Sequence, residues 1–169
     1  MIRYLRTLVP STMLALALAG CAGPDDDHDH HDHDLEALDA HVCEHFETQN
    51  WVQNIAAAVD PADAPLVFED PHLVYGIDFT GGEVDNGSVR FTHEGHADGV
   101  LYLSVDVPVE LTDAAGEPVE PSDEEHAPAC GEVSNRRHYH LHTGSYILTF
   151  GASQEASVRA LLALVESDH

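Results

Sequence analysis

Short runs of alternating apolar and polar residues constrain the fold of this chain more than any other feature. A period of two is typical of β-strands that turn one face toward a core. The runs cover residues 72–79, 88–93, 100–106, 137–142 and 145–150. Many short strands with turn-forming residues between them predict a mainly β fold, an antiparallel β-sandwich of jelly-roll type.

Details of the strand order also follow from the pattern. Thr143-Gly144 is a turn signal and predicts a hairpin between residues 137–142 and 145–150. Val107, Val109 and Leu111 continue the apolar face of residues 100–106 beyond Pro108. Residues 117–136 are acidic and proline-containing, and they are predicted to form a long loop.

The two ends of the predicted domain differ in pattern. Residues 35–46 lack Gly and Pro and place apolar side chains at helical spacing, so we expect a short helix before the sandwich. Residues 153–166 fit both a helical stripe and strand alternation. We predict a final strand there, because a sandwich needs its edge completed.

The first twenty residues have the layout of a secretory signal. Arg3 and Arg6 precede an apolar run from Leu8 to Ala19, which is too short to span a membrane. Leu18-Ala19-Gly20-Cys21 resembles the lipobox of bacterial lipoproteins, in which cleavage precedes an acylated cysteine. The resemblance implies lipidation of Cys21, and Ala22 after it implies sorting to the outer membrane, facing the periplasm or the cell surface. The alternative is a plain signal peptide cleaved after a small residue.

A stretch of only Asp and His follows the lipobox cysteine. Residues 25–34 cannot supply a hydrophobic core, so we expect residues 21–34 to be a lipidated, disordered tether before one sandwich domain at 35–169. Imidazole binds borderline transition metals, and the neighbouring carboxylates add charge and hydrogen-bond acceptors. The candidate metal ligands in this tether are His28, His30, His31 and His33.

The charge of the chain excludes some partners. Its 31 acidic residues all follow the predicted leader, where only four arginines and no lysine remain, so the formal charge of the mature chain is −27. Binding to phosphate backbones requires clustered Lys and Arg, so nucleic acid and anionic lipid surfaces are unfavourable partners. The acidity suits a soluble surface in a saline habitat, but it does not explain 14 histidines.

Two cysteines, Cys43 and Cys130, remain in the predicted domain. An even number in an oxidising compartment predicts one disulfide. The alternative is a thiolate ligand in a metal site, because His41 and His45 lie beside Cys43. On a helix these two histidines would share one face.

A family resemblance supports the sandwich. Residues 98–103, 109–116 and 139–148 resemble the small secreted β-sandwiches called bacterial pre-peptidase C-terminal domains, in which an Asp-x-x-Gly-type turn precedes a Gly-x-Tyr strand. The resemblance covers about half of the chain. It implies a non-catalytic module, although this chain carries many more histidines than that family does.

The motif with the most chemical content is His138-Tyr139-His140-Leu141-His142. On a strand its three imidazoles share one face, with neighbours roughly 6.6 Å apart and the outer two roughly 13 Å apart. One ion held by all three is therefore unfavourable, and a second set of ligands is needed. We expect His93 and His96 to supply it, with Glu94 as a ligand or an orienting partner. Two such pairs would suit zinc or copper. The alternative is that the histidines only cover a wet face.

The sequence does not indicate an enzyme. It contains no Gly-x-Ser-x-Gly turn, no His-Glu-x-x-His helix and no glycine-rich phosphate loop. We therefore expect a membrane-anchored, extracytoplasmic protein that binds, buffers or hands on a divalent transition metal, in the last case to a protein partner. The alternative is a non-enzymatic module that binds a protein or glycan at the cell surface. A small metalloenzyme is a third, weaker interpretation.

Overall fold

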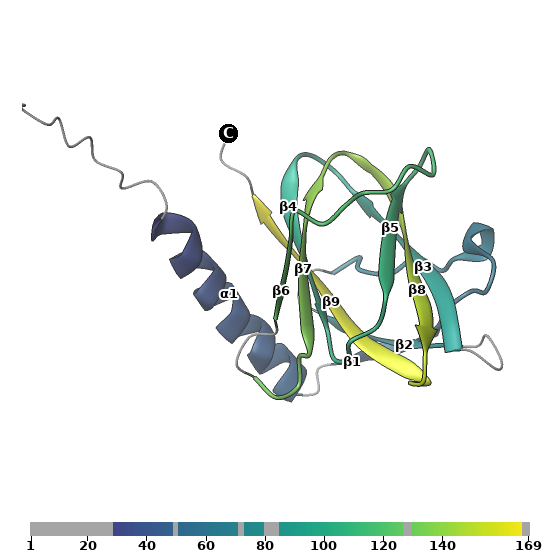
Figure 1. Ribbon diagram of the computed structural model, residues 1–169, viewed down its shortest axis with the longest axis horizontal. Helices are drawn as coiled ribbons and strands as arrows, with labels where there is room; N and C mark the ends of the chain where they lie inside the picture. Colours follow the sequence, from purple (N-terminus) through teal and green to yellow (C-terminus); the bar gives the residue numbers. More distant parts are fainter. Residues whose placement is uncertain (1–28, 49–50, 71–72, 80–84, 127–129, 167–169) are drawn as a thin grey trace, which may run out of the picture.

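Two β-sheets pack face to face, and the α-helix α1 lies on the outside of the larger one (Figure 1), while a short 3-10 helix spans Pro61–Asp63. The computed structural model describes residues 29–48, 51–70, 73–79, 85–126 and 130–166. Within these residues the strands are β1 (Trp51–Ala56), β2 (Val74–Asp78), β3 (Asp85–His93), β4 (Ala97–Leu103), β5 (Val109–Asp113), β6 (Asp123–His126), β7 (Asn135–Leu141), β8 (Gly144–Ser153) and β9 (Ser157–Glu166). The prediction of a β-sandwich is confirmed.

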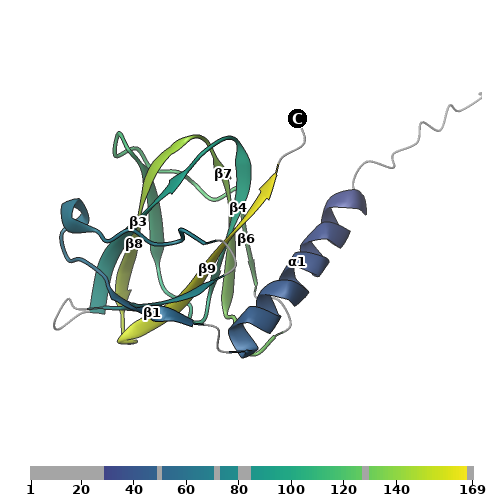
Figure 2. The ribbon, with the colours of Figure 1, turned by 180° about the vertical axis from the view of Figure 1, so that it is seen from behind.

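The larger sheet has the order β1-β2-β9-β4-β7-β6, and the smaller sheet has the order β3-β8-β5. All neighbours are antiparallel except β1 and β2, which are parallel. The last strand, β9, runs through the middle of the larger sheet between β2 and β4, which Figure 2 shows from behind. The preference for a strand over a helix at the end of the chain is therefore confirmed, but the strand lies inside the sheet and does not complete an edge, as the prediction had assumed.

The main core lies between the sheets. Strand alternation directs every second side chain into it, including Leu101 and Leu103 of β4, Leu148 and Phe150 of β8, and Leu162 of β9. Each of these side chains is buried.

The chain changes sheets between β4 and β5. Leu101, Val107 and Leu111 all reach the main core, as their common apolar pattern predicts, although β4 and β5 belong to opposite sheets. The buried guanidinium of Arg137 helps to fix this crossing, because it donates hydrogen bonds to the carbonyl oxygens of Val107 and Val109, at 3.4 and 3.0 Å.

The predicted hairpin at Thr143-Gly144 is wrong. β7 pairs with β4 and β6 in the larger sheet, whereas β8 pairs with β3 and β5 in the smaller one. The connection therefore crosses between the sheets, because both strands bury apolar side chains in the same core from opposite sides. The predicted long loop before β7 also contains a short strand, β6.

The helix α1 spans Asp29–Glu47 and therefore begins earlier than the predicted start at Leu35. The backbone of the last part of the Asp/His stretch is thus helical, in contrast to the expected disordered tether up to Asp34. Val42 and Phe46 of α1 are buried against Val100 and Tyr102 of β4, in a second apolar cluster on the outer face of the larger sheet. Within the described residues, no helix has the length and apolar character needed to cross a membrane.

Polar groups also hold α1 on the sheet. Asp39 accepts hydrogen bonds from the Tyr102 hydroxyl, at 2.8 Å, and from Nη1 of Arg136, at 2.6 Å. We call these three residues the Asp39 network. The predicted disulfide is present: Cys43 of α1 is bonded to Cys130, with 5.8 Å between their Cα atoms.

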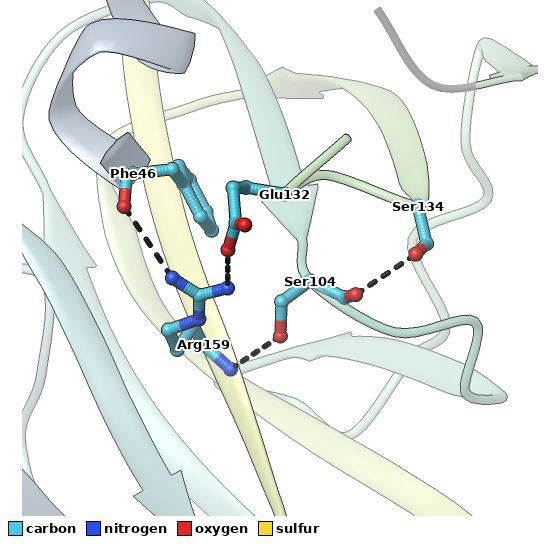
Figure 3. Close-up of polar contacts among 5 residues, drawn as sticks. All are labelled: Phe46, Ser104, Glu132, Ser134 and Arg159. Atoms are coloured by element: carbon cyan, nitrogen blue, oxygen red, sulfur yellow. Dashed lines mark hydrogen bonds and ion pairs between the residues drawn. The ribbon is translucent and has the colours of Figure 1, made fainter. Parts of the chain in front are cut away.

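Arg159 of β9 fixes the C-terminal end of α1 (Figure 3). Its guanidinium donates a hydrogen bond to the carbonyl oxygen of Phe46 at 3.4 Å, pairs with the carboxylate of Glu132 and lies 5.5 Å from the centre of the Phe46 ring. Three of the four arginines beyond residue 21, Arg136, Arg137 and Arg159, therefore contribute to the fold.

Candidate metal centre

The pairing of β4 with β7 assembles the candidate site. In this antiparallel ladder Tyr102 lies opposite Arg136, Val100 opposite His138, and Asp98 opposite His140. The ladder ends where Ala97 pairs with Leu141, so the next residues outward, His96 and His142, also face each other. We call the two outer pairs, Asp98 with His140 and His96 with His142, the histidine ladder.

His96 and His142 are in direct contact. Their Nδ1 atoms are 2.7 Å apart, and their rings meet edge to face with centroids 4.8 Å apart. Both side chains are exposed. A neutral imidazole has one donor and one acceptor nitrogen, so one ring donates its Nδ1–H to the bare Nδ1 of the other. If this proton were lost and the rings turned slightly, both nitrogen lone pairs could bind one ion at about 2.0 Å.

Contacts between the neighbouring turns fix the position of His96. The backbone N–H of Gly95 donates to Oγ1 of Thr143 at 2.8 Å, and the Thr143 hydroxyl donates to the carbonyl oxygen of Gly95 at 3.3 Å. Gly95 has a φ of 97°, a conformation that glycine adopts without the strain of a side chain. The turn between β3 and β4 is therefore tied to the residue that follows His142.

Tyr146 fixes the backbone of His142 from the other side. The Tyr146 hydroxyl accepts a hydrogen bond from the N–H of His142 and donates one to its carbonyl oxygen, both at 2.9 Å. The Tyr146 ring is buried and stacks on Phe91 at 5.2 Å between centroids. The histidine pair is thus connected to the main core through an aromatic side chain.

The second pair of the histidine ladder joins an imidazole to a carboxylate. Nδ1 of His140 donates to Oδ1 of Asp98 at 2.5 Å, and the His140 side chain is 72% exposed. A carboxylate that accepts the Nδ1–H of an imidazole fixes the tautomer in which Nε2 carries the lone pair. Many histidines that bind metals are held by a carboxylate in this way. Sequence analysis did not identify Asp98, because only the strand register places it opposite His140.

The other predicted ligands do not belong to the histidine ladder. His93 follows Val89 and Phe91 on the inward face of β3, and burial lowers its pKa, an effect that Glu94 opposes and His96 reinforces. Glu94 is exposed, and His138 is half-buried beside Val100. The two sheets therefore separate His93 from His138 and His140, which lie on the outer face of the larger sheet.

An open groove of about 350 Å³ adjoins the ladder. His140, His142 and Ser145 line it together with Asp113 and Val119, which lie at the end of β5 and in the turn beyond. Solvent and small ligands can therefore reach both imidazoles.

The remaining predicted residues lie outside this site. Cys21 and His28 fall outside the described residues, and only the backbone of His30, His31 and His33 is described, as part of α1. Among the described side chains, no group of three or more His, Cys, Asp or Glu residues is arranged to hold one ion. Residues two apart on one strand, such as His140 and His142, are roughly 6.6 Å apart along it. This separation keeps His140 from binding the same ion as His96 and His142.

The structure thus offers two imidazoles for one ion, with the other coordination positions left to water or to an exchanging ligand. No protein-family model matches the chain, and a search of curated proteins found no match.

Proposed function

We propose that this protein is a lipid-anchored, non-catalytic protein of the bacterial cell envelope that binds and buffers a divalent transition metal, zinc or copper, through paired histidines. The observation that carries the proposal is the contact between His96 and His142, whose Nδ1 atoms are 2.7 Å apart although the residues lie in different turns. The contact brings two ring nitrogens from separate turns to one point on an exposed surface, as a shared ion requires.

The chemistry of the pair favours exchange over permanent retention. Structural zinc sites are closed by four protein ligands, whereas two imidazoles leave coordination positions open. An open site releases its ion to a stronger ligand, as a buffering or transfer protein requires. His140 is hydrogen-bonded to Asp98 and belongs to the neighbouring pair of the histidine ladder. It offers a further nitrogen to an ion that approaches His96 and His142.

The compartment is inferred from two independent features. The leader with its lipobox cysteine resembles those of bacterial lipoproteins, and disulfides such as Cys43–Cys130 persist in oxidising compartments. A lipid anchor at Cys21 would hold the histidines of residues 28–33 close to the domain. The tether would then capture ions weakly and keep them near the histidine ladder at high effective concentration.

Calorimetric titration tests the proposal. A variant in which His28, His30, His31 and His33 are replaced by Gln removes the tether ligands, and copper or zinc is titrated into it at pH 7.5. We expect H96Q/H142Q in this background to lose one bound ion per chain, whereas H72Q/H126Q, which also removes two imidazoles, retains all of them. Equal stoichiometry for the two double variants would overturn the proposal and favour a surface interaction module.

The pH dependence provides a second readout. Protons compete for imidazole, so binding of the ion should weaken as the pH falls below about 6.5. Binding that does not change between pH 7.5 and pH 5.5 would indicate carboxylate ligands instead.

A further inference from the structure

A second histidine pair lies on α1. Nε2 of His41 and Nε2 of His45 are 3.0 Å apart, and the rings are nearly perpendicular, at 87°, with centroids 4.5 Å apart. His41 is exposed and His45 is half-buried. Histidines four apart on a helix lie one turn above the other on one face, the spacing with which His-Glu-x-x-His helices bind zinc.

This pair stands on a fixed backbone. Between the two histidines, Val42 packs into the outer apolar cluster and Cys43 is bonded to Cys130. Just beyond His45, Phe46 is buried and its carbonyl oxygen accepts a hydrogen bond from Arg159. The spacing of the two imidazoles therefore does not depend on a free helix that could unwind.

The two histidine pairs share one geometry. In both, a pair of like nitrogens lies within hydrogen-bond distance, at 2.7 Å for His96 with His142 and 3.0 Å for His41 with His45. In both, the rings are close to perpendicular, at 82° and 87°. The two pairs nevertheless come from a strand ladder and from a helix, so the common geometry does not follow from a common backbone.

The chemistry of the ligands distinguishes between metals. The nitrogens of each pair are hydrogen-bonded to each other, so their spacing is that of a hydrogen bond, and a ring must turn before both nitrogens can reach one ion. Square-planar nitrogen coordination is typical of copper(II) and nickel(II), and copper(II) binds most tightly of the divalent first-row metals.

We propose that His41 and His45 form a second metal site, separate from the His96–His142 site, and that it binds copper(II) in preference to zinc(II). The two sites lie at opposite ends of the sandwich: in Figure 1 the C-terminal end of α1 is at the bottom, and the start of β4, next to His96, is at the top. Water completes the coordination of each ion. The folded protein then carries two copper ions at a fixed separation.

Pulsed electron paramagnetic resonance on the copper-loaded protein measures that separation directly. In the variant lacking the four tether histidines, we expect two bound copper ions per chain and one narrow copper–copper distance. H41Q/H45Q should remove the distance and leave one ion. E36Q/E47Q, which changes two exposed carboxylates of the same helix, should leave both the distance and the two ions unchanged. A distance that persists in H41Q/H45Q would overturn the proposal.

The same variants separate this proposal from the proposed function. The H96Q/H142Q variant keeps only the α1 pair, and the H41Q/H45Q variant keeps only the pair on the ladder. If only the first variant binds copper, the α1 site is supported and the ladder site is contradicted. If only the second variant binds copper, the ladder site is supported and the α1 site is contradicted. For the metal preference, the H96Q/H142Q variant is titrated with copper in the presence of zinc. We expect copper to bind at least tenfold more tightly, and equal affinities would overturn this part of the proposal.

Discussion

The pairing of β4 with β7 carries two contrasting groups of polar side chains on one face of one ladder. At the inner end, Tyr102 and Arg136 are buried beneath α1 and share the carboxylate of Asp39. At the outer end, His96 and His142 lie in solvent and contact each other. Buried charges are costly unless they are paired, so the inner group serves the fold. The outer group is available to a ligand.

The largest effect on stability is expected for the disulfide of α1, the helix that covers the inner end of the ladder. We call this helix and the buried side chains beneath it the inner region. Because Cys43 and Cys130 are 87 residues apart, C43S/C130S should lower the free energy of unfolding by about 4–5 kcal/mol on the chain-entropy model. Urea denaturation of the variant measures this loss, and the reduced wild-type protein serves as its control. A loss below about 1 kcal/mol would contradict this model and show that residual structure already restrains the reduced, unfolded chain.

A smaller loss is expected within the Asp39 network. R136M removes the cation that neutralises a largely buried carboxylate, and breaking such a pair costs about 3 kcal/mol. D39N/R136M, which removes both charges, should recover part of that loss. A double-mutant cycle measured by denaturation checks the coupling, and additive effects would contradict the network.

The inner region should also set an alkaline limit to stability. Burial, followed by the hydrogen bond to Asp39, raises the pKa of Tyr102 well above its usual value. The unfolded chain ionises this tyrosine near pH 10, so its contribution to stability is present below pH 10 and falls as the pH rises further. Y102F should flatten this decline in thermal denaturation between pH 9 and pH 11. An unchanged slope would assign the decline to other groups.

The smallest effect on stability is expected in the outer region. Without metal, H96Q/H142Q should change the free energy of unfolding by less than about 0.5 kcal/mol, as surface substitutions usually do. Added copper should raise the melting temperature of the wild type more than that of this variant, because the ion binds the folded state. A metal-free loss above about 2 kcal/mol would indicate that the pair serves the fold as well.

Strand patterns in the sequence predicted much of the fold, but they left the sheet assignments open. Alternation predicts that Val107, Val109 and Leu111 point inward, and this prediction is confirmed. Alternation does not say which of two sheets a strand joins, because both sheets bury the same kind of side chain in one core. The wrong hairpin at Thr143-Gly144 has the same cause, since a two-residue connection serves a hairpin or a crossing equally well.

The candidate site shows the same limit. The sequence predicted that the imidazoles of His138, His140 and His142 share one face and that His96 complements them. Alternation also placed His93 on the face of Val89 and Phe91, which turns it toward the core and separates it from His138 and His140. The importance of Asp98 follows only from its register opposite His140, a long-range pairing that no local pattern contains.

The most direct test of the central claim is anomalous diffraction from crystals soaked in copper(II). The account predicts a difference peak between His96 and His142, about 2.0 Å from both Nδ1 atoms, with the two rings turned so that both lone pairs point at the ion. Peaks confined to scattered surface carboxylates, with the two imidazoles still hydrogen-bonded to each other, would contradict it.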